Sequence, residues 1–117
     1  MRGDMVAFIE IQWTSGSLDE ARRTSRYLVQ ERLVASAQII PWIESIYMLN
    51  NQLETTQETK ITLKAPIENF SKIYDIIKTN CSYEVPEIIY SKIDGGNQEF
   101  LEWLIESCPQ GFSESHT

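Results

Sequence analysis

The spacing of apolar residues changes several times along the chain, and each change predicts an element. From Val6 to Trp13 the chain is rich in β-branched and aromatic side chains, which predicts a largely buried first strand. Ser17 and Glu20 then have the spacing of a capping box, in which each side chain accepts a hydrogen bond from the other residue's backbone N–H. A helix is therefore expected to begin there and to end near Arg32. Its expected inner face consists of Leu18, Ala21, Ser25, Leu28 and Val29.

A long hairpin is predicted in the middle of the chain. The segment from Val34 to Met48 is apolar and extended, and Pro41 within it indicates a bulge or an edge because proline has no N–H to donate. Asn50-Asn51 provides the reversal, since asparagine tolerates positive φ better than most residues. The returning arm runs from Leu53 to Leu63. Its polar first half is expected to fray or to pair with another segment.

The second half of the chain predicts two more helices and a fourth strand. Ala65-Pro66 interrupts the hairpin, and apolar residues then recur at helical spacing over 67–79. Residues 86–93 form an apolar run that predicts a strand. The Gly95-Gly96-Asn97 sequence permits a turn into a short aromatic helix over 98–108.

These elements predict an α+β fold with the order β-α-β-β-α-β, a long hairpin between the second and third strands, and an extra C-terminal helix. That is the split β-α-β, or ferredoxin-like, order. The order does not indicate a function, because this fold hosts many unrelated ones. Without repeats or a linker, a single domain is expected over 1–108, followed by a flexible polar tail over 109–117.

Composition and charge indicate where the protein is expected in the cell and argue against nucleic acid as a partner. The 117 residues are 42% hydrophobic and 23% charged, as expected for one folded domain. The formal charge of −7 would repel a phosphate backbone, so nucleic acid is not an expected partner. No export signal and no apolar run of about 20 residues is visible, which predicts a cytoplasmic protein without a membrane span. Two cysteines in such a compartment are expected to be free thiols.

Few side chains offer catalytic or metal chemistry. The sole histidine, His116, lies in the polar tail, which argues against a catalytic triad and against a histidine metal site, so no catalytic activity is expected. Glu84 and Glu87 flank Pro86 and could divide acid and base roles only in a pocket that separates their pKa values. Cys81 follows a predicted helix C-terminus, where a thiolate is disfavoured, but it could still bind Cu(I).

Three arginines on the first predicted helix could form an anion-binding patch: Arg22, Arg23 and Arg26. A solvated helix face is the favoured interpretation, because acidic residues stand three or four positions away and can pair with them. Those acids are Asp19, Glu20 and Glu31.

Three stretches together carry a resemblance to a known family. They are "ERLVASAQIIPWIESIY" at 31–47, the Glu58–Ala65 stretch "ETKITLKA", and "YEVPEII" at 83–89 followed by "FLEWL" at 100–104. With the order of elements, they make the chain similar to the CutA family, named for divalent-cation tolerance. The resemblance implies a ferredoxin-like subunit in a tight homotrimer of PII-like architecture, with hairpins that wrap around neighbouring subunits. It also implies a link to copper and to metal tolerance.

The chain departs from the family pattern at positions that bear on metal. Ser36 stands where the family usually has cysteine, and a hydroxyl is a far poorer ligand for Cu(I). Cys81-Ser82 replaces the family's usual His-Pro, and Leu49-Asn50-Asn51 replaces its usual hairpin turn. The residues that match, and that the resemblance places near an intersubunit cleft, are Glu58, Lys64, Tyr83, Pro86 and Glu87.

The main hypothesis is a cytoplasmic homotrimer that takes part in the response to metal ions and binds copper or another divalent cation weakly between subunits. Cys81 would supply a soft ligand, Glu84 or Glu87 a hard one, and Lys64 would balance charge. The alternative is a PII-like signalling or scaffold module whose intersubunit clefts bind a small anion or a protein partner. In that case Lys64 and Arg32 would bind the partner, and Cys81 would serve packing.

Overall fold

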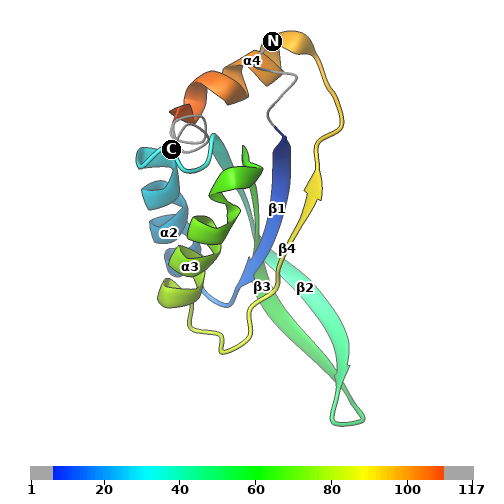
Figure 1. Cartoon of the computed structure of the whole chain (residues 1–117). Coiled ribbons are helices and arrows are strands. Elements are labelled where there is room, and N and C mark those ends of the chain that lie inside the picture. Colours follow the sequence, from blue (N-terminus) through cyan, green and yellow to red (C-terminus); the bar gives the residue numbers. More distant parts are fainter. Residues whose placement is uncertain (1–6, 110–117) are drawn as a thin grey trace.

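The computed structural model describes residues 7–109, so the predicted tail after Pro109 lies outside the described residues. Four strands form one antiparallel sheet in the order β2-β3-β1-β4. Helices α2 and α3 cover one face of this sheet, and α4 lies beyond its end (Figure 1). The elements are β1 (Phe8–Ser15), α2 (Leu18–Gln30), β2 (Ser36–Leu49), β3 (Gln52–Pro66), α3 (Phe70–Asn80), β4 (Ile88–Lys92) and α4 (Gln98–Ser107), with a 3-10 turn at Ile67–Asn69 before α3.

The main core lies between the sheet and the two helices. Side chains alternate between the faces of a strand, so the odd-numbered residues of β1 and β3 share the helical face. In the register, Ile9 pairs with Ala65 and Trp13 with Ile61. The fully buried side chains of this core include Ile9, Ile11, Trp13, Ala21, Leu28, Ile61, Leu63, Ile73 and Ile77. A smaller cluster beneath α4 contains Phe8, Ala35, Leu104 and Cys108.

The start of α2 confirms half of the predicted capping box. Ser17 Oγ accepts a hydrogen bond from the Glu20 N–H at 3.2 Å. The Glu20 side chain does not return to Ser17, whose own N–H donates instead to Ser15 Oγ at 3.2 Å. The first helix therefore begins as expected, but Glu20 is directed elsewhere.

The inner face of α2 differs from the prediction at its edges. Ala21, Ser25 and Leu28 are buried as expected, whereas Val29 is 39% exposed. Val29 follows Leu28 directly, and one residue turns a helix by roughly 100°, which takes its side chain off the buried face. The remaining buried positions are polar: Glu20 and Thr24.

The end of α2 precedes the predicted boundary, and Arg32 has a special backbone conformation. Arg32 adopts φ of 59°. Its N–H donates to the Val29 carbonyl at 3.0 Å, and the Leu33 N–H donates to the Leu28 carbonyl at 3.0 Å. These are the two hydrogen bonds of a Schellman motif, which usually has glycine at the left-handed position.

The β2–β3 hairpin projects from the body of the molecule, whose extents are 51 × 26 × 22 Å (Figure 1). Asn50 and Asn51 have φ of 52° and 64°, so the reversal is a two-residue type I′ turn, as predicted. A bulge interrupts the register between Ile40 and Ile43, which confirms the irregularity expected at Pro41. Pairing is continuous from Leu49 opposite Gln52 to the bulge, so the expected fraying is wrong. The tight turn fixes the register and outweighs the weak polar pattern.

Asn51→Val is expected to lower the free energy of unfolding by about 1–2 kcal/mol, because a β-branched residue is strained at φ of 64°. Urea unfolding at a fixed protein concentration measures this loss. Asn51→Gly, which fits positive φ without strain, is the matched control and should retain the stability. Equal losses in both variants would mean that the asparagine side chain, and not the backbone conformation, matters at the turn.

The remaining elements follow the prediction with shifted boundaries. The break expected at Ala65-Pro66 falls one residue later, since β3 includes Pro66, and the 3-10 turn occupies the first residues of the predicted second helix. Asn69 is buried and its Nδ2 donates to the Leu33 carbonyl at 2.9 Å, which ties this turn to the end of α2. None of the described helices is long and apolar enough to cross a membrane.

Candidate functional site

Most of the predicted site residues lie in or beside the loop over 81–87, which joins α3 to β4. Tyr83 reaches from this loop to β3, where its hydroxyl donates to Glu58 Oε2 at 2.7 Å. Burial, together with the hydrogen bond and the negative charge of Glu58, raises the pKa of Tyr83 to about 12. The phenol is therefore a neutral donor held in place by a carboxylate. Glu58 and Tyr83, which were both expected near an intersubunit cleft, contact each other within one chain.

The raised pKa of Tyr83 gives a pH-dependent stability. An ordinary tyrosine has a pKa of 10.0, so the unfolded chain loses this proton first as the pH rises. The contribution is fully present below about pH 10 and is lost as the pH rises through about 12. Tyr83→Phe should flatten this part of a plot of unfolding free energy against pH. Phenolate absorbance provides a second measurement, and a Tyr83 pKa at the ordinary value of 10.0 would contradict the prediction.

Gly16 allows Tyr83 to lie where it does. A Cβ atom at Gly16 would stand 2.8 Å from Tyr83 Oη and 2.9 Å from its Cε1, closer than side chains pack. The tyrosine ring therefore lies against the backbone between β1 and α2. The importance of this glycine was not predicted from the sequence, where its only signal is its place between a predicted strand and the helix cap.

Glu20 forms a buried junction between three segments. Glu20 is only 6% exposed. Its Oε2 accepts a hydrogen bond from Ser15 Oγ at 2.7 Å, and its Oε1 accepts one from the Ser82 N–H at 3.0 Å. The carboxylate thus joins the end of β1 and the start of α2 to the loop that carries Tyr83. The contacts of Glu20 with Ser15 and Ser82 were not predicted, because the spacing of Ser17 and Glu20 indicated a capping box instead.

Cys81 lies beside this junction and not beside the predicted acidic partners. It packs against the main core. Burial raises the pKa of the Cys81 thiol, and the nearby carboxylate of Glu20 raises it further, although the Tyr83 backbone N–H acts in the opposite direction. The thiol form is thus favoured, as expected for a cysteine at the end of α3. The neutral thiol form is favoured more strongly at Cys108, because burial raises its pKa to about 12.

Glu84 and Glu87 lie in different surroundings from Cys81. Glu87 Oε2 accepts from Gln12 Nε2 at 2.8 Å, and Gln12 belongs to the open face of the sheet, opposite the core that Cys81 contacts. Glu84 is exposed, and its carbonyl accepts a hydrogen bond from Lys78 Nζ. Within residues 7–109 no three His, Cys, Asp or Glu side chains gather into a group that could hold a metal ion. The three-ligand metal site stays a prediction that requires a second subunit.

Lys64 lies far in space from the contact between Glu58 and Tyr83. Its Nζ donates to Gln38 Oε1 at 2.9 Å and stands 3.8 Å from Glu10 Oε2, both on the open sheet face. Lys64 and Glu58 share β3 and are six residues apart, which separates them by roughly 20 Å. The predicted cleft residues therefore form two groups, one near the middle of β3 at Glu58 and one near its C-terminal end at Lys64. Pro86 lies half-buried in the loop with Tyr83.

The three arginines of α2 are exposed, as the solvated-face interpretation predicted, but within residues 7–109 they do not form the ion pairs that were expected to accompany it. None of Arg22, Arg23 and Arg26 stands within ion-pair distance of an acidic side chain in the part of the chain that the structure describes. Glu20, one of the acids expected to pair with them, is turned inward to Ser15 and Ser82. The outer surface of α2 is therefore more positive than the sequence indicated.

Comparison with known proteins assigns the family. Residues 9–107 match the family described as CutA1 divalent ion tolerance protein. The divalent-cation tolerance protein CutA of Thermus thermophilus is 36% identical over 94 residues, which cover 80% of this chain and 91% of that protein. The chloroplastic protein CutA 1 of Oryza sativa is 31% identical over 102 residues, which cover 87% of this chain and 58% of that longer protein.

A solved structure agrees with the sequence relatives. The structure described as the periplasmic divalent cation tolerance protein CutA from Archaeoglobus fulgidus superposes with a TM-score of 0.80 at 32% identity, covering 86% of this chain and 98% of that one. The α+β fold with its four-stranded antiparallel sheet is thus that of CutA1 structures. The chain belongs to the CutA1 family of divalent ion tolerance proteins.

Proposed function

We propose that this protein works as a homotrimer in tolerance of divalent cations, with ferredoxin-like subunits that bind their ligands between chains. The observation that carries the assembly is the projecting hairpin. Trp42, Ile46, Met48 and Leu53 have exposed fractions from 62% to 70%. A lone chain would leave this apolar surface in water, and covering it removes that cost.

The open face of the sheet supports the same assembly. The helices α2 and α3 pack on one face only, and the sheet order β2-β3-β1-β4 with the element order β-α-β-β-α-β is the arrangement expected of a ferredoxin-like subunit (Figure 1). Ile40 and Ile89 are more than half exposed on the opposite face. Strand β2 also forms an edge of the sheet, and an unprotected edge favours pairing with another chain.

Light scattering tests the assembly at micromolar concentration. The expected mass is three times the 13.5 kDa of one chain. Leu53→Glu should reduce the trimer fraction, because it places a charge on the proposed contact surface. Val29→Glu makes the same change at an exposed position of α2 and is the matched control, which should leave the mass unchanged. A single-chain mass for the unmodified protein would remove the assembly.

Copper or another divalent cation is the proposed ligand, with Cys81 as the soft donor and Glu84 or Glu87 as a hard donor. A thiolate suits Cu(I), and the raised pKa of Cys81 means that the metal must displace a proton. Uptake in equilibrium dialysis should therefore increase with pH. Cys81→Ser should lower Cu(I) uptake, whereas Cys108→Ser, at a fully buried thiol, should not. Equal uptake by Cys81→Ser and the unmodified protein would exclude Cys81 as a ligand.

We infer a role without catalysis, and we place the protein in the cytoplasm. Both thiols have raised pKa values, which makes them poor nucleophiles, and the Tyr83 phenol is bound to Glu58. The relatives named above include chloroplastic and periplasmic proteins, so the family does not fix the location. The inference rests on the two free cysteines, which suit a reducing compartment. Cell fractionation tests it.

The PII-like alternative has less support in the described residues. It relies on Lys64 to attract an anion, but the Lys64 ammonium already contacts Gln38 and Glu10. Arg32 holds the left-handed position at the end of α2 and stands near Cys108, where its charge offsets only part of the rise in the thiol pKa that burial causes. A thermal-shift comparison of metal ions with nucleotides and organic anions separates the two functions.

A further inference from the structure

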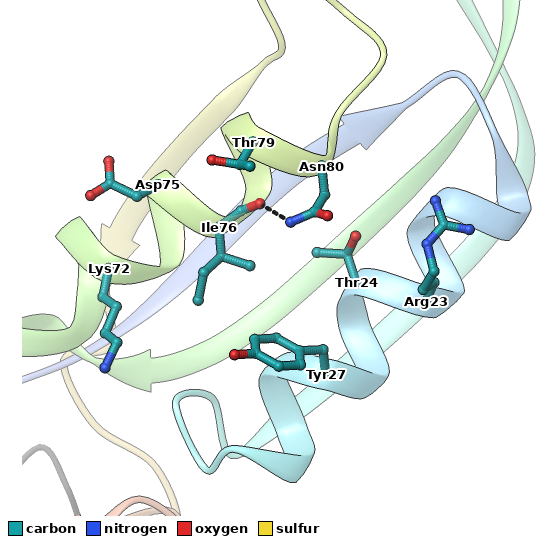
Figure 2. Close-up of a pocket in the computed structure, with 8 residues that line it drawn as sticks. All are labelled: Arg23, Thr24, Tyr27, Lys72, Asp75, Ile76, Thr79 and Asn80. Atoms are coloured by element: carbon teal, nitrogen blue, oxygen red, sulfur yellow. Dashed lines mark hydrogen bonds between the residues drawn. The ribbon is translucent and has the colours of Figure 1, made fainter.

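A groove of about 410 Å³ separates α2 from α3 on the helical side of the molecule. Figure 2 shows Tyr27 extending from α2 toward α3 and Ile76 pointing from α3 into the space between the helices. These two side chains form apolar walls, and the volume is in the range of small-ligand sites. The other lining residues are polar or charged: Arg23, Thr24, Lys72, Asp75, Thr79 and Asn80.

The groove is positive in a protein that is negative overall. Arg23 and Lys72 line it from opposite helices, while the formal charge of the whole chain is −7. Arg22 and Arg26 line an adjoining depression with Arg23, which strengthens the positive potential at that end. Asp75 lines the rim, but Figure 2 shows its carboxylate directed away from Tyr27 and Ile76.

Thr24 provides an independent sign of a ligand. The residue is only 3% exposed, and its hydroxyl has no hydrogen-bond partner among the described residues. Figure 2 shows this hydroxyl directed toward the space between α2 and the end of α3. A buried hydroxyl without a partner lowers stability, so its presence is explained if something in the groove bonds to it. Asn80 does not supply that bond, because its Nδ2 donates to the Ile76 carbonyl at 2.7 Å.

We propose that this groove binds a small organic anion with an acidic head group and a flat apolar body. The head group, a carboxylate or a phosphate, lies at the Arg23 end, where a guanidinium can donate two parallel hydrogen bonds. The apolar body lies between Tyr27 and Ile76, and the Thr24 hydroxyl bonds to the ligand at the floor of the groove. Lys72 provides a second positive charge at the other end.

This site is independent of the proposed assembly and of metal binding. The groove opens on the helical side, whereas the proposed contact surfaces are the hairpin and the opposite face of the sheet (Figures 1 and 2). A trimer formed through those surfaces would leave the groove open. Neither Cys81 nor the acids of the loop over 81–87 line it.

Calorimetric titration of the intact protein tests the proposal with phenyl phosphate and phenylacetate as probes. Saturable binding of one probe per chain is expected for at least one of them, and the two probes distinguish phosphate from carboxylate recognition. Phenylethylamine and benzyl alcohol, which have the apolar body without the negative charge, should bind at least tenfold more weakly. No binding by either anion, or equal binding of the uncharged probe, would overturn the proposal.

Two pairs of variants locate the site. Arg23→Gln should weaken binding about tenfold or more, whereas Arg22→Gln, which removes the same charge outside the groove, should change it less than about twofold. Thr24→Val should raise the melting temperature of the free protein and should also weaken binding of the probe. A purely structural hydroxyl would not give this combination. Equal effects of the two arginine variants would indicate general charge attraction and would overturn the site.

Discussion

Replacing Glu20 with alanine is expected to lower the free energy of unfolding by about 3 kcal/mol. The carboxylate accepts hydrogen bonds from Ser15 Oγ in a buried place and from the Ser82 N–H in a partly buried one, and both bonds would be lost, although the Ser15 hydroxyl keeps the Ser17 carbonyl as an acceptor at 3.0 Å. The loop that carries Tyr83 would also lose its tie to the start of α2. Urea unfolding at one fixed protein concentration measures the loss, since the stability of an oligomer depends on concentration.

Two controls separate the hydrogen bonds from the charge. Glu20→Gln keeps one acceptor oxygen, so it should lose about half as much as Glu20→Ala. Asp19→Ala removes a carboxylate from the exposed side of the same helical turn and should cost less than about 1 kcal/mol. If Asp19→Ala and Glu20→Ala had equal effects, the stability would come from the negative charge near the helix N-terminus and not from the junction.

Gly16→Ala is expected to lower the free energy of unfolding by about 1–3 kcal/mol, the usual cost of an overpacked contact. The new methyl group would stand 2.8 Å from Tyr83 Oη, so the ring would move and its 2.7 Å hydrogen bond to Glu58 would lengthen or break. The pKa of Tyr83 should then fall toward its ordinary value of 10.0. Absorbance titration of the phenol checks this directly.

The matched control for this substitution is Gly95→Ala. A Cβ atom at Gly95 meets nothing within 4 Å, so that variant should be neutral or slightly stabilising. Combining Gly16→Ala with Tyr83→Leu tests the cause, because a smaller side chain at 83 leaves room for the methyl group. The loss due to Gly16→Ala should be smaller in that background. An unchanged loss would assign the effect to the backbone of Gly16.

The sequence predicted the order and the type of the elements because those depend on neighbouring residues. Ser17 marks the start of α2 through a contact three residues away, and Asn50-Asn51 marks the hairpin through its own backbone preference. Pro41 indicated the bulge for the same kind of reason. The polar first half of β3 misled the prediction, because its pairing is determined by the turn and by the facing strand.

The candidate site depended on contacts between distant parts of the chain, and there the sequence was less informative. Glu20 binds Ser82, which lies 62 residues away, and nothing in the local pattern indicates that choice over the capping box. Gly16 likewise contacts Tyr83 only once the fold is formed. The family resemblance placed Tyr83 and Glu58 near the same cleft, but it did not predict the hydrogen bond between them. The separation of Lys64 from that pair follows from strand geometry, since both residues lie on β3.

The bulge at Trp42 divides the hairpin into two halves whose side chains follow opposite numbering. Ile40 faces Lys60, and Ile43 faces Glu58, so one extra residue in β2 places an odd-numbered side chain on the face that even-numbered ones occupied before. Loss of that one residue would leave one β2 residue opposite Thr59, so Ile40 and Ile43 would keep their partners and their face while the bulge itself disappeared. What the extra residue provides is a local bend and a stronger twist in β2, so its loss should change the direction in which the hairpin leaves the body of the molecule and not which side chains face β3.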